Sequence, residues 1–149
     1  MEITLALVEY IRRARTSIYI QNPYVVLTPT METALREASQ RGVKIIINTN
    51  SPKNTDSLLT QAIFNEEWNQ VMKKIPSGKI FAAKGPSKLH AKVFTFDGRY
   101  SIVGSYNMDY LSESINSEIA VLVDSTDFAM QINGTIEQHM YLDSVEYFT

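Results

Sequence analysis

The stretch KLHAKVFTFDGRYSIVGSYN, residues 88–107, contains two apolar runs joined by Asp97-Gly98. That dipeptide is a strong signal for a two-residue hairpin turn. We therefore expect residues 90–96 and 101–105 to form neighbouring antiparallel strands. The strands of this hairpin also carry most of the residues in the chain that are suited to chemistry.

Nucleophilic and hydrogen-bonding groups gather at one end of the predicted hairpin. Alternate side chains of a strand share a face, so His90 and Lys92 are expected to point the same way. The turn brings Gly104 and Ser105 level with them, where the glycine permits close backbone approach. Ser105 and Asn107 add uncharged donors at a predicted helix start. An imidazole, an ammonium, a hydroxyl and an amide suit a phosphoryl group, and a neutral imidazole can attack phosphorus.

The rest of the chain alternates between strand and helix patterns. The order predicts one domain over residues 1–149, an α/β sandwich with a mixed, mostly parallel sheet and helices on both faces. Thr30 is expected to cap the second helix and Gly42 to end it. The expected helices are 3–15, 30–40, 56–74 and 126–140, and the further strands are 17–26, 43–50, 79–83 and 118–123.

Composition narrows the class of protein. A net charge of -2 over 149 residues argues against a broad basic footprint for nucleic acid. The chain has no cysteine and no His/Asp/Glu cluster with ligand spacing, so we expect neither a metal nor another cofactor. It also lacks a signal peptide pattern and any apolar run near the roughly 20 residues of a membrane span. We expect a cytoplasmic protein, or one peripheral at the inner membrane face.

The hairpin resembles the HKD motif of the phospholipase D superfamily. The likeness covers most of the chain up to Asp124 and is greatest to the C-terminal half of bacterial cardiolipin synthase-like proteins. It implies a phospholipase D-like α-β-α sandwich that hydrolyses phospholipids or transfers a phosphatidyl group through a phosphohistidine. The matching residues and spacing are His90-x-Lys92-x4-Asp97-x6-Gly104-Ser105-x-Asn107, followed by the strand NSEIAVLVD, residues 116–124.

The resemblance also implies a role for each matching residue. His90 would be either the nucleophile that forms the phosphohistidine or the acid that protonates the leaving oxygen, depending on which half of a paired site it occupies. Glu118 would hydrogen-bond the far nitrogen of the His90 ring, and Asp97 would act more as a structural partner than as a phosphate ligand. The implied catalytic set is His90, Lys92, Asp97 and Glu118, and the implied phosphate-binding set is Lys92, Gly104, Ser105 and Asn107.

The family's reaction uses two HKD motifs, whereas this chain has one. His139 lacks the neighbouring residues of the motif, and we expect it on a helix surface. We favour the interpretation that the chain is the C-terminal half of a two-motif protein. The alternative is a site built across a homodimer, as in the small nucleases of the superfamily.

The expected partners are a phospholipid, a second HKD domain and a membrane surface. Two other functions stay open. The chain is then either a metal-independent homodimeric endonuclease that acts on nucleic acid, or a catalytically incomplete half-domain. The head group and the acceptor, water or an alcohol, are not specified by the sequence.

Overall fold

The computed structural model describes residues 2–51, 72–84, 88–142 and 145–148 of the chain. Helices and strands alternate in the order expected from the sequence, with one extra strand near the end. The elements are α1 (Glu2–Arg13), β1 (Ser17–Gln21), α2 (Pro29–Gln40), β2 (Lys44–Asn50), β3 (Gly78–Ala83), β4 (Val93–Phe96), β5 (Tyr100–Gly104), α4 (Tyr110–Ser114), β6 (Ala120–Asp124), α5 (Thr126–Leu142) and β7 (Val145–Phe148).

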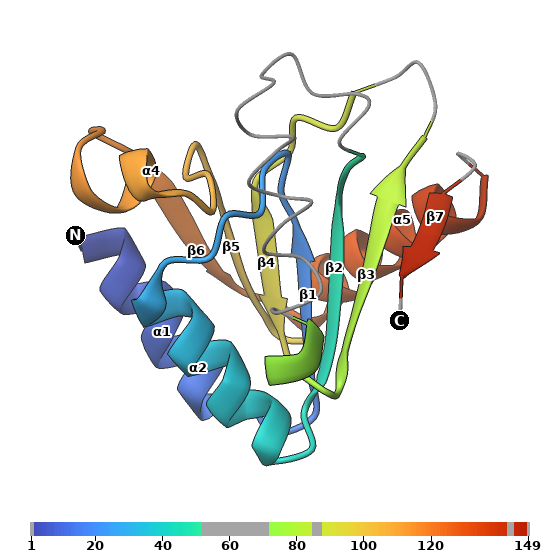
Figure 1. Ribbon diagram of the computed structural model, residues 1–149, viewed down its shortest axis with the longest axis horizontal. Helices are drawn as coiled ribbons and strands as arrows, with labels where there is room; N and C mark the ends of the chain where they lie inside the picture. Colours follow the sequence, from blue (N-terminus) through green and yellow to red (C-terminus); the bar gives the residue numbers. More distant parts are fainter. Residues whose placement is uncertain (1, 52–71, 85–87, 143–144, 149) are drawn as a thin grey trace.

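The described strands form one seven-stranded sheet in the order β6-β5-β4-β1-β2-β3-β7. Helices α1 and α2 lie on one face of this sheet and α5 lies on the other (Figure 1). The α/β sandwich with helices on both faces is therefore confirmed.

The sheet is mixed, but the expected predominance of parallel pairs is wrong. Only β1–β2 and β2–β3 are parallel, whereas β1–β4, β4–β5, β5–β6 and β3–β7 are antiparallel. The physical reason is the short connections, because a tight turn between β4 and β5 can join only antiparallel strands. The unexpected strand β7 adds the fourth antiparallel pair.

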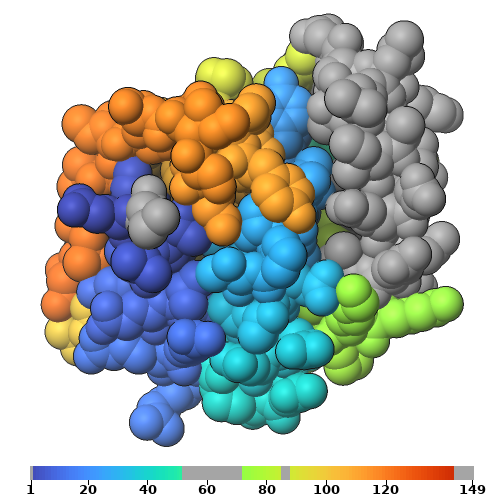
Figure 2. Space-filling model, turned by 60° about the vertical axis from the view of Figure 1, so that its left-hand side comes forward, coloured from blue at the N-terminus to red at the C-terminus, as the bar shows by residue number. Residues whose placement is uncertain are grey.

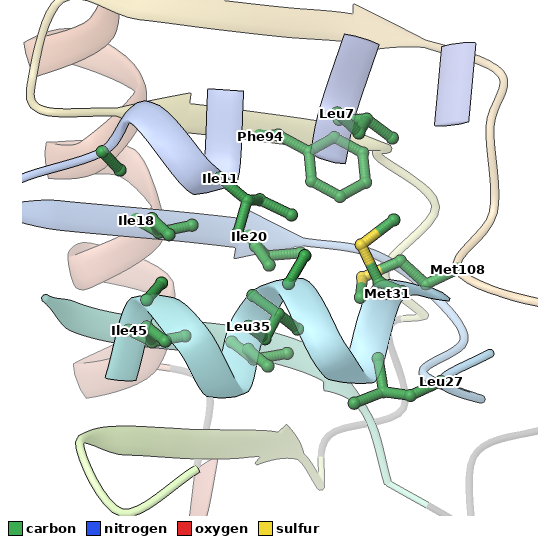
Figure 3. Packing of buried hydrophobic residues seen from close by; sticks show 14 of the residues in the cluster. Leu7, Ile11, Ile18, Ile20, Leu27, Met31, Leu35, Ile45, Phe94 and Met108 are labelled. Carbon is green, nitrogen blue, oxygen red and sulfur yellow. The ribbon is translucent and has the colours of Figure 1, made fainter. Parts of the chain in front are cut away.

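The main core lies between the sheet and the α1–α2 layer. Leu7 and Ile11 from α1 and Leu35 from α2 point toward Ile18 and Phe94 on the strands (Figure 3). All five side chains are at most 1% exposed. Burial of such side chains contributes about 1.5–3 kcal/mol each relative to exposure, so this layer holds the two helices on the sheet.

Helix α5 is attached to the opposite face by polar bonds around a smaller apolar cluster. The hydroxyl of Tyr19 donates to Glu137 at 2.6 Å, and the hydroxyl of Thr95 donates to Asn133 at 2.5 Å. Ile136 is fully buried between them and the sheet. None of the helices in the described ranges is long and apolar enough to cross a membrane.

Several predicted boundaries shift in the structure. The helix cap is Thr28 rather than Thr30, because Pro29 occupies the first helical position and the Thr28 hydroxyl accepts from the nitrogen of Met31 at 3.3 Å. Gly42 does follow α2, with φ of 83°. The predicted helix 56–74 falls largely outside the described residues, and only its last turn, 72–74, is described as helical.

The expected tight turn forms at Asp97-Gly98, but the connection is one residue longer than expected, because Phe96 pairs with Tyr100 and residues 97–99 lie between the strands. Asp97 and Gly98 have φ of 53° and 63°, and the nitrogen of Arg99 donates to the carbonyl of Phe96 at 3.0 Å. Positive φ at both central positions is the geometry of a type I′ turn, which matches the twist of paired strands. The first strand of this hairpin begins at Val93 instead of at residue 90, so His90 and Lys92 precede β4.

Candidate active site

Except for Asp97, the polar residues singled out by the sequence lie at one end of the strands, which we call the catalytic edge of the sheet; this end is uppermost in Figure 1. Parallel strands β1 and β2 end there, β4 and β6 begin there, and β5 ends there. Ligands of open α/β sheets bind at the carboxyl ends of such strands. The pairing of β4 with β5 continues to this edge, where the nitrogen of Gly104 donates to the carbonyl of Lys92 at 3.1 Å.

His90 and Lys92 lie together, as expected, although they are not in a strand. The Nζ atom of Lys92 donates to the carbonyl of His90 at 2.8 Å and lies 3.3 Å from Nε2 of the same residue. His90 is exposed, whereas Lys92 is only 9% exposed. Burial lowers the pKa of Lys92, and the nearby charge of Glu118 partly opposes that shift. The pair presents an accessible imidazole backed by a buried cation.

Ser105 and Glu118 are in direct contact. The Ser105 hydroxyl donates to one carboxylate oxygen of Glu118, and the Ser112 hydroxyl donates to the other at 2.7 Å. These two hydrogen bonds lower the pKa of Glu118, and the charge of Lys92 lowers it further. Glu118 is therefore an ionised carboxylate that the hydroxyls of Ser105 and Ser112 fix in place at this end of the sheet.

The hydrogen bond between Glu118 and the ring of His90 that the resemblance implied is absent, although both residues are described. The carboxylate faces Ser105 and Ser112 instead, and it reaches the motif's cation only through the electrostatic effect on Lys92. The orienting role of Glu118 toward His90 stays a prediction.

Asn107 lies beside these groups with an unused acceptor. Its Oδ1 atom is buried without a hydrogen-bond partner, while its backbone nitrogen donates to Ser112 at 3.1 Å. A buried amide oxygen without a partner is costly, so such atoms call for a functional explanation. The neighbouring amide donor is the group that the sequence assigned to phosphate.

Gly104 has a structural explanation that differs from the expected one. A Cβ atom at this position would lie 2.1 Å from the carbonyl oxygen of Ile119 and 2.7 Å from Cα of Ala120. The close approach that the glycine permits is therefore that of the backbone of residues 119–120, which leads into β6. This approach brings residue 119 against Ser105, whose nitrogen donates to the carbonyl of Ile119 at 2.9 Å, and so sets Glu118 next to Ser105; a role of Gly104 at phosphate stays a prediction.

Asp97 is separated from the other motif residues. It follows β4, whereas Lys92 precedes β4, and five residue steps along a strand span roughly 17 Å. Its carboxylate accepts hydrogen bonds from the nitrogens of Arg15, Thr16 and Ser17 at 2.8–3.1 Å. The inclusion of Asp97 in the catalytic set is corrected accordingly, because the residue fastens the hairpin to the start of β1.

The same hydrogen bonds fix the charge state of Asp97. Burial alone would raise the pKa of this carboxyl, but hydrogen bonds from the backbone of residues 15–17 and from the Thr16 hydroxyl lower it below its usual value. The structural role that the resemblance implied for Asp97 agrees with this geometry.

The described residues contain no group of three or more His, Cys, Asp and Glu side chains that could hold a metal ion. His139, expected at the surface, is half-buried in α5, and its Nδ1 atom has no hydrogen-bond partner.

The motif pattern missed three residues that shape the site, namely Ser112, Asn22 and Asn50. Ser112 was detectable only through its spacing after Asp109, whose side chain accepts from the Ser112 nitrogen at 2.8 Å and caps α4. Asn22 follows β1, inside the strand predicted over residues 17–26, and Asn50 ends β2, at the predicted end of strand 43–50.

Comparisons with known proteins agree with this geometry. The model of the family described as "Cardiolipin synthase, PLD-like domain" matches residues 7–140. Cardiolipin synthase A of Proteus mirabilis is 30% identical over 94% of this chain and 27% of its own length. The probable cardiolipin synthase YwiE of Bacillus subtilis is 28% identical over 89% of this chain and 25% of its own length. The chain thus spans less than a third of these curated relatives.

Among solved structures, the phospholipase D family member Nuc from Salmonella typhimurium is similar in fold. The TM-score is 0.78 at 23% sequence identity, and the match covers 97% of this chain and 89% of Nuc. At that identity the likeness concerns the fold alone.

Proposed function

The chain belongs to the family of phospholipase D-like domains of cardiolipin synthase, and on this premise we propose that it acts on phospholipids through a phosphohistidine at His90. Membership of the superfamily supports phosphodiester chemistry, either hydrolysis or transfer. The observation that carries the proposal is the exposed imidazole of His90 beside the buried ammonium of Lys92, 3.3 Å apart.

In the first step, a ring nitrogen of His90 attacks the phosphorus of a phosphodiester. A nitrogen–phosphorus bond forms, and the bond from phosphorus to the departing alcohol oxygen breaks. Negative charge grows on the phosphoryl oxygens, and we assign its stabilisation to the ammonium of Lys92 and the amide of Asn107. The departing oxygen takes a proton from a general acid.

In the second step, water or an alcohol attacks the phosphohistidine and displaces His90. Hydrolysis results when water attacks, and phosphatidyl transfer results when an alcohol attacks. The attacking oxygen gives its proton to the base that served as the acid in the first step. The motif itself supplies one histidine, so the proposal assigns this acid–base group to a second HKD domain.

The surface beside the site supports a partner of that kind. Ile115 and Ile119 are each 74% exposed, and Leu111 is 54% exposed. These side chains flank Glu118 in sequence, on α4 and in the segment that leads to β6. Space-filling shows α4 at the surface beside α1 (Figure 2). An exposed apolar surface next to the catalytic edge is typical of a surface that binds another folded domain. The second domain would belong to a longer parent protein or to another copy.

The proposal can be tested by trapping the intermediate. The longer parent protein, and separately this chain at a concentration that favours dimers, is incubated with fluorescent phosphatidylglycerol in EDTA, quenched and digested. We expect a mass increase of a phosphatidyl group on the peptide that carries His90, together with turnover that EDTA does not reduce. A His90→Gln variant should show neither. Turnover without an adduct on His90 would refute the assignment of this nucleophile.

A metal-independent homodimeric endonuclease is the second candidate. The observation that favours it is the likeness in fold to Nuc, with a TM-score of 0.78. Nicking of single-stranded DNA in EDTA by a dimer of this chain, with no turnover of phosphatidylglycerol, would select it. A chain that is monomeric and inert on both substrates would be a catalytically incomplete half-domain.

A further inference from the structure

Two asparagines at the catalytic edge bind the backbone of the catalytic loops. Asn22 follows β1 and is fully buried, and Asn50 ends β2 and is 7% exposed. Neither belongs to the HKD motif. A buried side-chain amide needs both donors and acceptors, and here peptide groups satisfy them.

Asn50 binds both sides of Leu89, the residue before His90. Its Oδ1 atom accepts from the nitrogen of Leu89 at 2.7 Å, and its Nδ2 atom donates to the carbonyl of Leu89 at 2.9 Å. That carbonyl belongs to the peptide bond that ends at the nitrogen of His90. The nucleophile lies in a segment without strand structure, and Asn50 supplies a two-point attachment of the kind that strand pairing supplies elsewhere.

Asn22 binds both sides of Asn107 in the same way. Its Nδ2 atom donates to the carbonyl of Tyr106 at 3.0 Å, and its Oδ1 atom accepts from the nitrogen of Met108 at 3.2 Å. These two groups belong to the peptide bonds that precede and follow Asn107. The side chain of Asn22 thus fixes the backbone orientation of Asn107 directly.

The strands that carry these asparagines, β1 and β2, are hydrogen-bonded to each other. Gln21 and Asn48 are partners in the β1–β2 ladder, and the nitrogen of Asn22 donates to the carbonyl of Asn48 at 3.0 Å. The two amides therefore project from one parallel pair toward two different loops. The distance between the loops is set by the spacing of β1 and β2.

From these contacts we infer that Asn22 and Asn50 are positioning residues, which hold Asn107 and His90 in register for the reaction. This inference rests on the proposed function, in which His90 attacks a phosphoryl group that Asn107 binds. A displacement of about 1 Å at a reacting group can lower a rate by about 100-fold. The contacts predict that kcat depends on the two amides more than KM does.

The test compares three substitutions in the full chain. Asn50→Leu removes both bonds to Leu89 at similar volume. Asn50→Asp keeps the acceptor for the Leu89 nitrogen and loses the donor. Asn133→Ala is the control. It removes a hydrogen bond of an asparagine side chain outside the catalytic edge, the one that Asn133 in α5 accepts from Thr95 in β4. The readouts are kcat and KM for phosphatidylglycerol and hydrogen exchange at the amide of Leu89.

We expect kcat to fall by about 100-fold in Asn50→Leu, less in Asn50→Asp and by no more than about twofold in Asn133→Ala, with KM changed by less than about threefold. Exchange at the Leu89 amide should rise in Asn50→Leu and stay slow in Asn50→Asp. An equal series, Asn22→Leu and Asn22→Asp, should act on the amide of Met108.

Wild-type kcat in a folded Asn50→Leu, or equal losses in Asn50→Leu and Asn133→Ala, would overturn the inference. If Asn50→Leu does not fold, wild-type kcat in Asn50→Asp would overturn it. If the wild-type chain does not turn over phosphatidylglycerol, the proposed function fails. Hydrogen exchange at the amides of Leu89 and Met108 then decides by itself whether Asn50 and Asn22 hold the segments around His90 and Asn107.

Discussion

The ammonium of Lys92 donates to the carbonyl oxygen of His90 at 2.8 Å, so the cation of the motif is hydrogen-bonded to the backbone of the histidine beside it. The bond makes the placement of the charge dependent on the His90 backbone. A change in that backbone would therefore move the nucleophile and its neighbouring cation together.

The lowered pKa of Lys92 predicts loss of activity at alkaline pH. The ammonium is present below its pKa and is lost as pH rises through it, and burial places that pKa below the usual value for lysine. We expect the pH profile of kcat/KM to decline earlier than an ordinary lysine would allow. Lys92→Arg, which stays charged, should lack the decline. The same alkaline decline in both proteins would show that another group causes it.

The bonds to Glu118 predict a change in its titration when one is removed. Ser112→Ala deletes the donor 2.7 Å from the carboxylate, so the pKa of Glu118 should rise toward its usual value. The measurement is a carbon NMR titration of the Glu118 carboxyl. Ser114→Ala, at an exposed position of α4, is the control and should leave it unchanged. An unaltered pKa in Ser112→Ala would contradict the assigned bond.

Asp97 predicts a pH-dependent component of stability. A carboxyl whose pKa is lowered by folding stabilises the protein above its unfolded pKa, and this contribution disappears as pH falls through the folded pKa. Asp97→Asn tolerates positive φ but loses the charge. We expect a loss of about 1–2 kcal/mol in the free energy of unfolding at pH 7, after allowance for solvent exposure.

The difference between wild type and Asp97→Asn should shrink on acidification below about pH 4, near the unfolded pKa of aspartate. Chemical denaturation at several pH values measures it. A difference that stays constant with pH would mean that turn geometry, and not the carboxylate, accounts for the loss.

Two glycines should respond to alanine in opposite directions. Gly104→Ala forces the β6 backbone away from β5, and we expect a loss of about 2–4 kcal/mol in the free energy of unfolding. Gly134→Ala meets nothing within 4 Å in α5, so higher helix propensity should add about 0.5–1 kcal/mol. Thermal unfolding of both variants measures the effects. Equal tolerance at both positions would contradict the close packing at Gly104.

Local signals in the sequence predicted the hairpin and its clustering of residues. Asp97-Gly98 specifies a turn through its backbone preference alone, and the turn then fixes which residues of β4 and β5 face each other. The proximity of His90 and Lys92 was predicted from their spacing of two in the sequence, and it holds although the strand begins later, at Val93.

Contacts between distant segments could not be read in the same way. The bond from Asn50 to Leu89 joins positions 39 apart, and that from Asn22 to Met108 joins positions 86 apart. Asparagine is common at strand ends and in turns, so Asn22 and Asn50 predict by themselves only that a strand ends there. The role of Gly104 was missed for a related reason, because its neighbour is β6 and not a ligand.

The attachment of Asp97 to the start of β1 has a consequence for the spacing of the motif. The four positions between Lys92 and Asp97 are Val93–Phe96, the whole of β4. The carboxylate of Asp97 anchors one end of this strand, and the reactive groups lie at the other end. The spacing between Lys92 and Asp97 in the motif therefore equals the length of β4. Inserting a single residue there would reverse the inward and outward side chains of the strand and detach the chemistry from its anchor.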